Sequence, residues 1–295
     1  MKTITPTIGQ LRMLASIKGQ QWMIRPEAVE EFALSALEIP EHASTRSRAD
    51  MNDDDDDGDG WWSDYYTLRK SMFIDPDGIA HIQVRGALLN QCPPIYEKLG
   101  IATRYGTIIA ETARAQQSGA AAILYEINSP GGTVSGIIEC GQALSACPIP
   151  TASFCYGLAC SAAYWLPCCT GAIIATPSAL VGNVGAIITW ADCDAFWADL
   201  GVTFKALVSE GADLKSTFHL EPDDTQLAFL QESIDEAGAA FRAQVEIGRA
   251  ASGAELDPEV FRAGWYSGEK AGALGLIDAI GTADDAIQYL KQMVS

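Results

Sequence analysis

Beyond residue 70, hydrophobic residues recur with two different periods, and segments with one period alternate with segments with the other. Ile79–Leu88 alternates between apolar and polar positions, as a half-buried strand does, whereas Ala121–Ile127 and Thr151–Cys155 are short continuous apolar runs typical of buried strands. Between these segments, apolar residues return every three or four positions in residues 106–118 and 134–146, which predicts amphipathic helices. This succession predicts βαβ units and therefore an α/β fold with a mostly parallel sheet.

The pattern continues toward the C-terminus with shorter segments. It predicts strands at 171–176 and 203–208 and a helix at 192–200. From Asp223 onward, apolar residues three or four positions apart predict one long amphipathic helix, with Pro222 and Asp223 at its start. The apolar positions of this helix are Leu227, Leu230, Ile234, Ala237, Phe241 and Val245.

Composition divides the chain into three regions. Residues 1–41 predict an N-terminal arm, in which Gln21–Glu27 is a short extended piece that leads into a helix with proline in its first turn. Residues 42–62 are polar and include the unbroken acidic run Asp53–Asp57. Adjacent like charges repel and bury no apolar area, so we expect a disordered linker there, and not a calcium site, which needs spaced ligands. Residues 63–295 form the predicted main domain.

Size and charge narrow the class of protein. With 295 residues, 48% of them hydrophobic, the chain can bury a sizeable core. It contains no run of about twenty apolar residues for a bilayer span, and no apolar signal-peptide segment follows Met1–Pro6. We therefore expect a soluble protein. The net charge of −19 predicts that the surface repels nucleic acid and anionic membranes.

The cysteines predict neither disulfides nor a metal centre. No two of them have Cys-x-x-Cys spacing, and most lie in apolar stretches, so we expect buried free thiols in a reducing cytoplasm. Cys160 is the one that we expect reagents to reach. The eight residues are Cys92, Cys140, Cys147, Cys155, Cys160, Cys168, Cys169 and Cys193.

Ser161 lies where a buried strand is expected to lead into a helix. The apolar run that begins at Thr151 passes Gly157 and reaches Ser161, after which Ala162 and Ala163 begin a helix of small residues. The first N–H groups of a helix have no partner within it, so a negative charge beside them is stabilised. Ser161 is therefore a candidate nucleophile; the alternative is that it is an ordinary helix N-cap.

A second strand-to-turn junction lies about thirty residues upstream. The strand Ala121–Ile127 leads into Ser129, Pro130, Gly131 and Gly132. Two adjacent glycines free the backbone to direct N–H groups toward a carbonyl under attack. Both junctions follow strands of the predicted sheet, where ligands of α/β folds bind.

Three motifs in order carry a resemblance to a known family. They are Asn128–Gly132, Ala159–Tyr164 and Ala175–Gly185. The chain resembles the signal peptide peptidase A family of serine peptidases, and within it the phage-encoded branch that matures capsids. The similarity extends from Ile79 to Leu290.

The resemblance implies a Clp/crotonase-like α/β fold with repeated β-β-α units and a Ser/Lys catalytic dyad in residues 63–295. Ser161 would be the nucleophile. N–H groups of Gly131 or Gly132 and of Ala162 would form the oxyanion hole.

The sequence identifies the general base less clearly than the other candidate catalytic residues. The three histidines, His42, His81 and His219, do not fall where a Clp-type triad places one. The resembled family uses a lysine that becomes neutral through desolvation, and it places this lysine a few residues after a glycine, at Lys215. One residue more than usual separates Gly211 from Lys215, and the loop to Pro222 is shorter than in the family. A surface role for Lys215 and His219 as base remain the alternatives.

Three further lysines follow the nucleophile. Lys205 lies within a predicted strand, Lys270 at a charged helix start, and Lys291 on a terminal helix. We expect a solvated role for Lys270 and a surface position for Lys291.

The predicted function is that of a serine endopeptidase without a cofactor or metal. The resemblance implies protein substrates, namely capsid, scaffold or portal proteins, and a homo-oligomeric ring in the bacterial cytoplasm or inside a phage prohead. Two alternatives remain: an inactive capsid assembly or scaffold protein on the same fold, and a crotonase-type acyl-CoA enzyme with carboxylate acid–base residues.

Overall fold

The computed structural model describes residues 21–24, 71–189, 198–199, 201–203, 205–215 and 222–294. Most of the predicted arm, the whole predicted linker with Asp53–Asp57, and His42, Cys193 and His219 lie outside these residues.

The main sheet is predominantly parallel. Strands β3 (Ile79–Arg85), β6 (Ala122–Ser129), β8 (Thr151–Cys160) and β10 (Leu180–Gly182) run parallel in the order β10-β8-β6-β3. β2 (Met72–Ile74) and β12 (Trp265–Ser267) flank them antiparallel, and β9 (Ile173–Ala175) branches parallel from β8 to β13 (Ala279–Ile280). The predicted α/β class with a mostly parallel sheet is confirmed.

A second, smaller sheet lies beside the ends of the main strands, in the order β11-β1-β7-β4-β5. Its strands are β11 (Ile187–Ile188), β1 (Gln21–Ile24), β7 (Gly131–Thr133), β4 (Ala87–Leu89) and β5 (Ala102–Arg104). β4 follows β3 directly, and β7 follows β6, so these two main strands each continue into a short strand of the second sheet and then into a helix. These are the β-β-α units of the expected Clp/crotonase-like fold.

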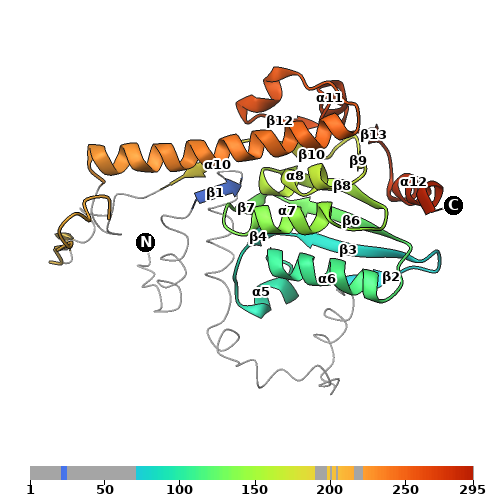
Figure 1. Cartoon of the computed structure of the whole chain (residues 1–295), viewed down its shortest axis with the longest axis horizontal. Helices are drawn as coiled ribbons and strands as arrows, with labels where there is room; N and C mark the ends of the chain where they lie inside the picture. The colour runs from blue at the N-terminus through green and yellow to red at the C-terminus, as the bar shows by residue number, and fades with distance from the viewer. Residues whose placement is uncertain are drawn as a thin grey trace, which may run out of the picture.

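Helices cover both faces of the main sheet (Figure 1). α6 (Tyr105–Gln117) and α7 (Ile137–Ser145) pack on one face, where Ile82, Val84 and Tyr125 belong to the same core as Ile108 and Leu144. α12 (Ala283–Val294) packs on the other face through Ala286 and Leu290. The remaining short helices are α5 (Pro94–Lys98), α8 (Ala162–Trp165), η1 (Pro167–Cys169), η2 (Pro258–Arg262) and α11 (Gly268–Ala273).

The long helix α10 (Asp224–Ala251) confirms the amphipathic pattern from Asp223 onward. Asp223 caps it by accepting a hydrogen bond from the N–H of Gln226, whose side chain returns a bond to the N–H of Asp223. Its C-terminal half packs on the body through Phe241, which stacks on Trp165. Its N-terminal half projects from the body as an arm (Figure 1).

Several predicted boundaries differ from the structure. The strand expected over Ile79–Leu88 is divided between two sheets at Gly86, where φ is 64° and a Cβ atom would lie 2.2 Å from the carbonyl oxygen of Ile101. The helix expected from residue 134 begins at Ile137, because Gly131–Thr133 form β7.

The expected strand over 203–208 is wrong, since residues 205–208 are irregular and exposed. Apolar residues such as Val208 have no neighbouring strand there among the described residues, and a strand needs one.

The described residues also contain no helix that is long and apolar enough to cross a bilayer.

Candidate active site

Ser161 has a strained backbone at the junction of β8 and α8. Its φ of 58° and ψ of −127° lie in a region that residues with a side chain rarely adopt. The conformation is held on both sides: the N–H of Ser161 donates to Gly182 O at 2.8 Å, and its carbonyl oxygen accepts from the N–H groups of Tyr164 and Trp165. Such strain concentrates at functional sites, because only the surrounding structure can maintain it.

The hydroxyl of Ser161 does not serve as a helix cap. Ser161 occupies the N-cap position of α8, yet its side chain makes no capping hydrogen bond. Instead, Oγ lies 3.5 Å from the carbonyl oxygen of Gly185. The side chain is therefore available for chemistry, although Ser161 is only 1% exposed.

The two glycines of the predicted oxyanion hole lie in β7. A Cβ atom on Gly132 would lie 1.8 Å from the carbonyl oxygen of Leu88, and one on Gly131 would lie 2.2 Å from that of Met23. Glycine is thus required here for the close approach of neighbouring strands. The N–H of Gly131 donates to Ser129 Oγ at 3.2 Å.

Gly131 is nevertheless close to Ser161. The same Cβ position on Gly131 lies 2.9 Å from the carbonyl oxygen of Cys160, the residue before Ser161. Ala162, the third predicted donor, is the first residue of α8 and is fully buried. The structure therefore brings Ser161, Ala162 and the Gly131–Gly132 turn together.

Lys215 lies elsewhere in the described chain. Its side chain is exposed, and its N–H donates to the carbonyl oxygen of Ala212. The carbonyl oxygen of neighbouring Asp213 accepts a hydrogen bond from Gln226, in the first turn of α10. α10 contacts β1 through Ser233, seven residues after Gln226. It stacks on Trp165 of α8, the helix that follows Ser161, at Phe241, which lies fifteen residues after Gln226, or about 22 Å along the helix axis.

Within one chain, the described structure thus does not bring Lys215 to Ser161. Figure 1 shows the segment that ends at Lys215 at the tip of the α10 arm. No described lysine or histidine forms a hydrogen bond with Ser161 Oγ.

The other described candidates for a base are engaged or exposed. Lys270 pairs with Glu259, Lys291 pairs with Asp77, and Lys205 is exposed. His81 is held between Glu126 at Nδ1 (2.8 Å) and Asp75 at Nε2 (3.2 Å). Burial disfavours the charged ring, but the two carboxylates outweigh it and raise the pKa of His81. His81 therefore joins β3 to β6 and to the β2–β3 turn.

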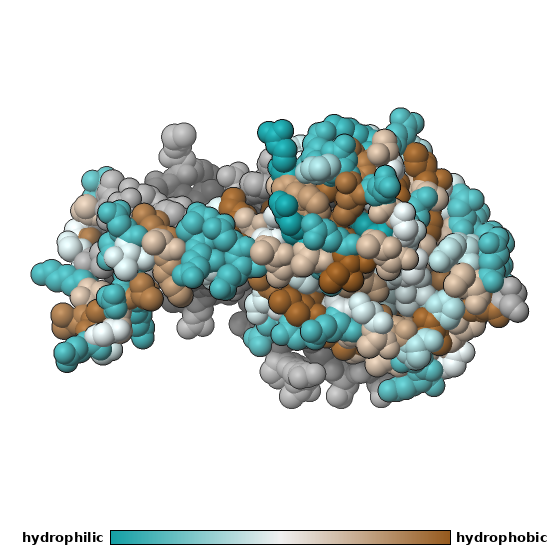
Figure 2. Space-filling model, turned by 45° about the horizontal axis from the view of Figure 1, so that its top comes forward, coloured by the Kyte–Doolittle hydropathy of each residue, from teal (hydrophilic) through white to brown (hydrophobic). Residues whose placement is uncertain are grey.

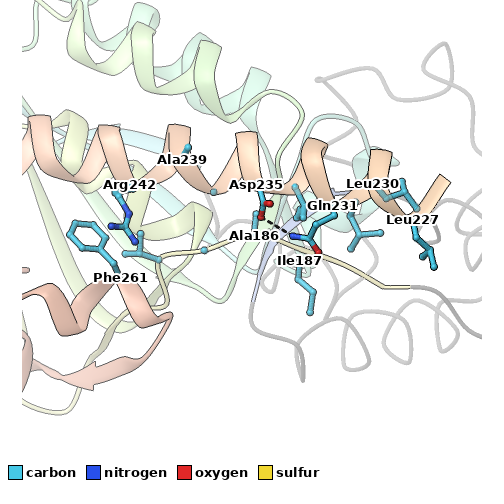
Figure 3. Close-up of a pocket in the computed structure, with 14 residues that line it drawn as sticks. Ala186, Ile187, Leu227, Leu230, Gln231, Asp235, Ala239, Arg242 and Phe261 are labelled. Carbon is cyan, nitrogen blue, oxygen red and sulfur yellow. Dashed lines mark hydrogen bonds between the residues drawn. The ribbon is translucent and has the colours of Figure 1, made fainter. Parts of the chain in front are cut away.

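A groove of about 660 Å³ lies between α10 and the segment that contains β11. It begins at Val184 and Gly185, next to Ser161 Oγ. Figure 3 shows Leu227 and Leu230 lining the arm end, Ile187 near the middle, and Arg242 and Phe261 the body end. Asp235 accepts a hydrogen bond from Gln231 midway along the groove. The groove can hold an extended segment with apolar side chains.

The sequence reasoning missed the groove, Gly185 and the involvement of β1. The apolar run Trp22–Ile24 was the available signal for β1, because three adjacent apolar residues seldom remain exposed. The groove gave no such signal, since it arises from the meeting of two distant segments.

The cysteines have structural roles. The seven described cysteines are free, as expected. Cys160, which we expected reagents to reach, is fully buried, because its strand lies between β6 and β10, and its thiol donates to Leu180 O. That expectation is wrong. Burial likewise raises the pKa of the thiols of Cys155 and Cys168.

Comparison with known proteins identifies relatives of the C-terminal half of the chain and of longer parts of it. Residues 145–295 match peptidase family S49, and this region contains Ser161, Ala162 and Lys215. Protease 4 of Salmonella typhi is 31% identical over 176 residues, which cover 58% of this chain and 28% of that protein. Capsid assembly protease C of Escherichia phage lambda is 27% identical over 221 residues, which cover 73% of this chain and 49% of that protein.

The chain therefore spans half or less of the length of these relatives. A solved structure of the 1510-N membrane-bound stomatin-specific protease with a substrate peptide aligns over 72% of this chain and 78% of its own, at 14% identity and a TM-score of 0.43. Since the family match covers half of the 295 residues, the chain belongs to peptidase family S49.

Proposed function

We propose that the protein is a serine endopeptidase with Ser161 as nucleophile and Lys215 as general base. The observation that carries this proposal is the strained, uncapped Ser161 at a strand–helix junction beside a peptide-sized groove. Oγ would attack the carbonyl carbon of the scissile bond while its proton passes to Lys215 Nζ. The ammonium would then protonate the leaving amine, and water would hydrolyse the acyl-enzyme.

The oxyanion of the tetrahedral intermediate would be stabilised by backbone N–H groups. Ala162 and either Gly131 or Gly132 are the proposed donors, because all three lie around Ser161. For Gly131 this requires its N–H to exchange the hydroxyl of Ser129 for the substrate oxygen.

We propose that Lys215 reaches a serine of a neighbouring subunit in a homo-oligomeric ring. Two observations support this arrangement: the separation of Lys215 from Ser161 within one chain, and the exposed apolar residues of the arm. Figure 2 shows hydrophobic side chains on the projecting part of the molecule. Phe229 of the arm and Leu207 and Leu214 of the segment that precedes it are exposed. Contact with a second subunit would also remove water from Lys215, which a lysine base requires.

The proposed substrates are capsid, scaffold or portal proteins of a phage or prophage, cut during head maturation. The resemblance to a phage capsid assembly protease supports this substrate class. The groove would take apolar side chains next to the scissile bond. The proposed location is the bacterial cytoplasm or the interior of the prohead.

Complementation between inactive variants tests the dyad and its arrangement together. We expect Ser161→Ala and Lys215→Ala each to abolish peptide cleavage when expressed alone. When the two are co-expressed, sites that combine an intact serine with a neighbour's intact lysine should cleave again. Absence of restored cleavage would exclude the arrangement across subunits, and cleavage by Lys215→Ala alone would exclude Lys215 as base.

The separation of Lys215 from Ser161 also favours a second candidate, an assembly protein on the same fold without activity. A fluorophosphonate probe distinguishes the two, because it labels only an activated serine. Labelling that Ser161→Ala removes supports the peptidase. An unlabelled oligomer that still binds capsid protein supports the assembly role. The crotonase alternative loses its basis, because the chain belongs to a peptidase family.

A further inference from the structure

β1 lies between the two short strands that flank the nucleophile. It pairs antiparallel with β7 on one side, with Met23 opposite Gly132 and Ile24 opposite Gly131. It pairs antiparallel with β11 on the other side, with Gln21 opposite Ile188 and Trp22 opposite Ile187. Figure 1 shows it beneath α10 and beside β7.

The backbone of β1 reaches the immediate surroundings of Ser161. At Gly131, a Cβ atom would meet Met23 O at 2.2 Å, Ile24 Cα at 2.9 Å and Cys160 O at 2.9 Å. On the β11 side, Gly185 O lies 3.5 Å from Ser161 Oγ. β1 thus lies between β7, which contains two of the proposed oxyanion donors, and β11, which begins two residues after Gly185.

The side chains of β1 hold it there. Trp22 and Ile24 pack in a small apolar cluster with Leu89 of β4 and Tyr96 of α5. Met23 faces the main core, and Gln21 donates a hydrogen bond to Ser233 of α10. Ser161 is 1% exposed in this arrangement, so a polypeptide cannot reach it until some part of its surroundings moves.

We infer that β1 occupies the position of the substrate strand, so that the chain carries an internal competitor for its own active site. Proteins commonly bind an extended peptide by adding it as a strand to free sheet edges, and here the edges of β7 and β11 that face each other are both taken by β1. Displacement of β1 frees both edges at once. This inference rests on the proposed peptidase function and assigns its regulation.

A reversible crosslink between β1 and β11 tests the inference. Gln21 and Ile188 are directly opposite in an antiparallel pair, where Cα atoms lie about 4.5–5.5 Å apart, within the range for a disulfide. In the full-length double variant Gln21→Cys/Ile188→Cys, we expect oxidation to lower the kcat/KM for a fluorescent peptide at least tenfold. Reductant should restore it. The single variants Gln21→Cys and Ile188→Cys, treated with the same oxidant, should keep their activity.

Each outcome is decisive for one of the two proposals. Full activity of the crosslinked enzyme, with the bond confirmed by mass spectrometry, would overturn the inference, because substrate would then enter beside a fixed β1. If neither the reduced double variant nor the unmodified protein is labelled by a fluorophosphonate or cleaves peptide, the proposed function fails instead.

A second pair of variants covers the case in which the disulfide does not form. Trp22→Ala weakens the hold on β1, so we expect kcat/KM to rise severalfold. Leu290→Ala removes a buried side chain from the separate apolar cluster under α12, which contains no residue of β1, and we expect no rise. An equal fall in kcat/KM in both variants would show that β1 only supports the structure of the site, and it would overturn the inference.

Discussion

The backbone of Ser161 depends on its neighbours, whereas its hydroxyl contributes little to stability. The strained φ is maintained by main-chain hydrogen bonds with Gly182, Tyr164 and Trp165. The side chain is close to a single acceptor, Gly185 O, at the long distance of 3.5 Å. The proposed role of Ser161 as nucleophile can therefore be tested without disturbing the fold.

We expect Ser161→Ala to abolish fluorophosphonate labelling and peptide cleavage while changing the free energy of unfolding by less than about 1 kcal/mol, because no strong hydrogen bond is lost. Labelling assays and urea denaturation measure the two effects. A labelled Ser161→Ala protein would mean that another serine is the nucleophile.

Lys215 can be tested by a change that keeps its charge. A guanidinium does not lose its proton in the accessible pH range, so Lys215→Arg should cleave as poorly as Lys215→Ala. Lys205→Ala, a matched exposed lysine of the same segment, should retain activity. Turnover measurements on a fluorescent peptide decide the matter, and substantial activity of Lys215→Arg would contradict the role as base.

Arg249 and Asp278 form a salt bridge in which the guanidinium group is almost completely buried. Arg249 is 2% exposed and donates to both carboxylate oxygens of Asp278 and to the carbonyl oxygen of Gly275. Asp278 also accepts from the N–H of Ile173. The pair therefore ties the end of α10 to β9.

Arg249→Ala leaves the carboxylate of Asp278 without its partner, so we expect a loss of about 3–5 kcal/mol in the free energy of unfolding. Arg242→Ala, an exposed arginine on the same helix, should lose less than about 1 kcal/mol. Urea denaturation followed by circular dichroism compares the two. Equal losses would contradict the assigned importance of the buried pair.

Among the elements, the junction of β2, β3 and β6 carries the clearest pH dependence. The pKa of His81 is raised by Glu126 and Asp75, and the pKa values of both carboxyl groups are lowered in return. The histidine contribution to stability is complete below its unfolded pKa of about 6.5 and disappears as pH rises through the raised value. The carboxylate contributions are complete above about 4.5 and disappear as pH falls.

Stability supplied by this junction should therefore be greatest between about pH 4.5 and 6.5. We expect the melting temperature of the unmodified protein to fall as pH rises above 6.5, and we expect this fall to be absent in His81→Gln. Thermal melts across this range measure it. An unchanged profile would mean that other groups determine the alkaline side.

Local patterns predicted those elements whose partners are also local. Apolar runs indicated β6 and β8, and the three- to four-residue period indicated α6, α7 and α10 with the correct start at Asp223. β7 and β11 escaped prediction, because two or three residues show no period and their pairing with Gln21–Ile24 spans more than a hundred positions. The position of Ser161 at a strand–helix junction was predictable from its strand and turn. The position of Lys215 relative to Ser161 was not, because sequence spacing does not tell where an irregular segment lies relative to the sheet.

For the whole molecule, the α10 arm should govern assembly. Phe229 is 45% exposed on the arm, so Phe229→Asp should disrupt the proposed ring, abolish cleavage and leave the melting temperature nearly unchanged. Ala243→Asp, an exposed position on the body half of α10, should retain both assembly and cleavage. Analytical ultracentrifugation gives the assembly state. A Phe229→Asp protein of unchanged mass would contradict the role of the arm.

The placement of α12 has a practical consequence for handling the protein. α12 packs where the main strands begin, against Ile79 and Ala122, whereas Ser161 follows the last residue of β8. Ten residues of strand, or roughly 33 Å, separate the two ends of β8. A surface anchor or reporter attached after Val294 would therefore leave from the edge of the sheet opposite Ser161, and the immobilised protein would keep the proposed active site facing away from the support.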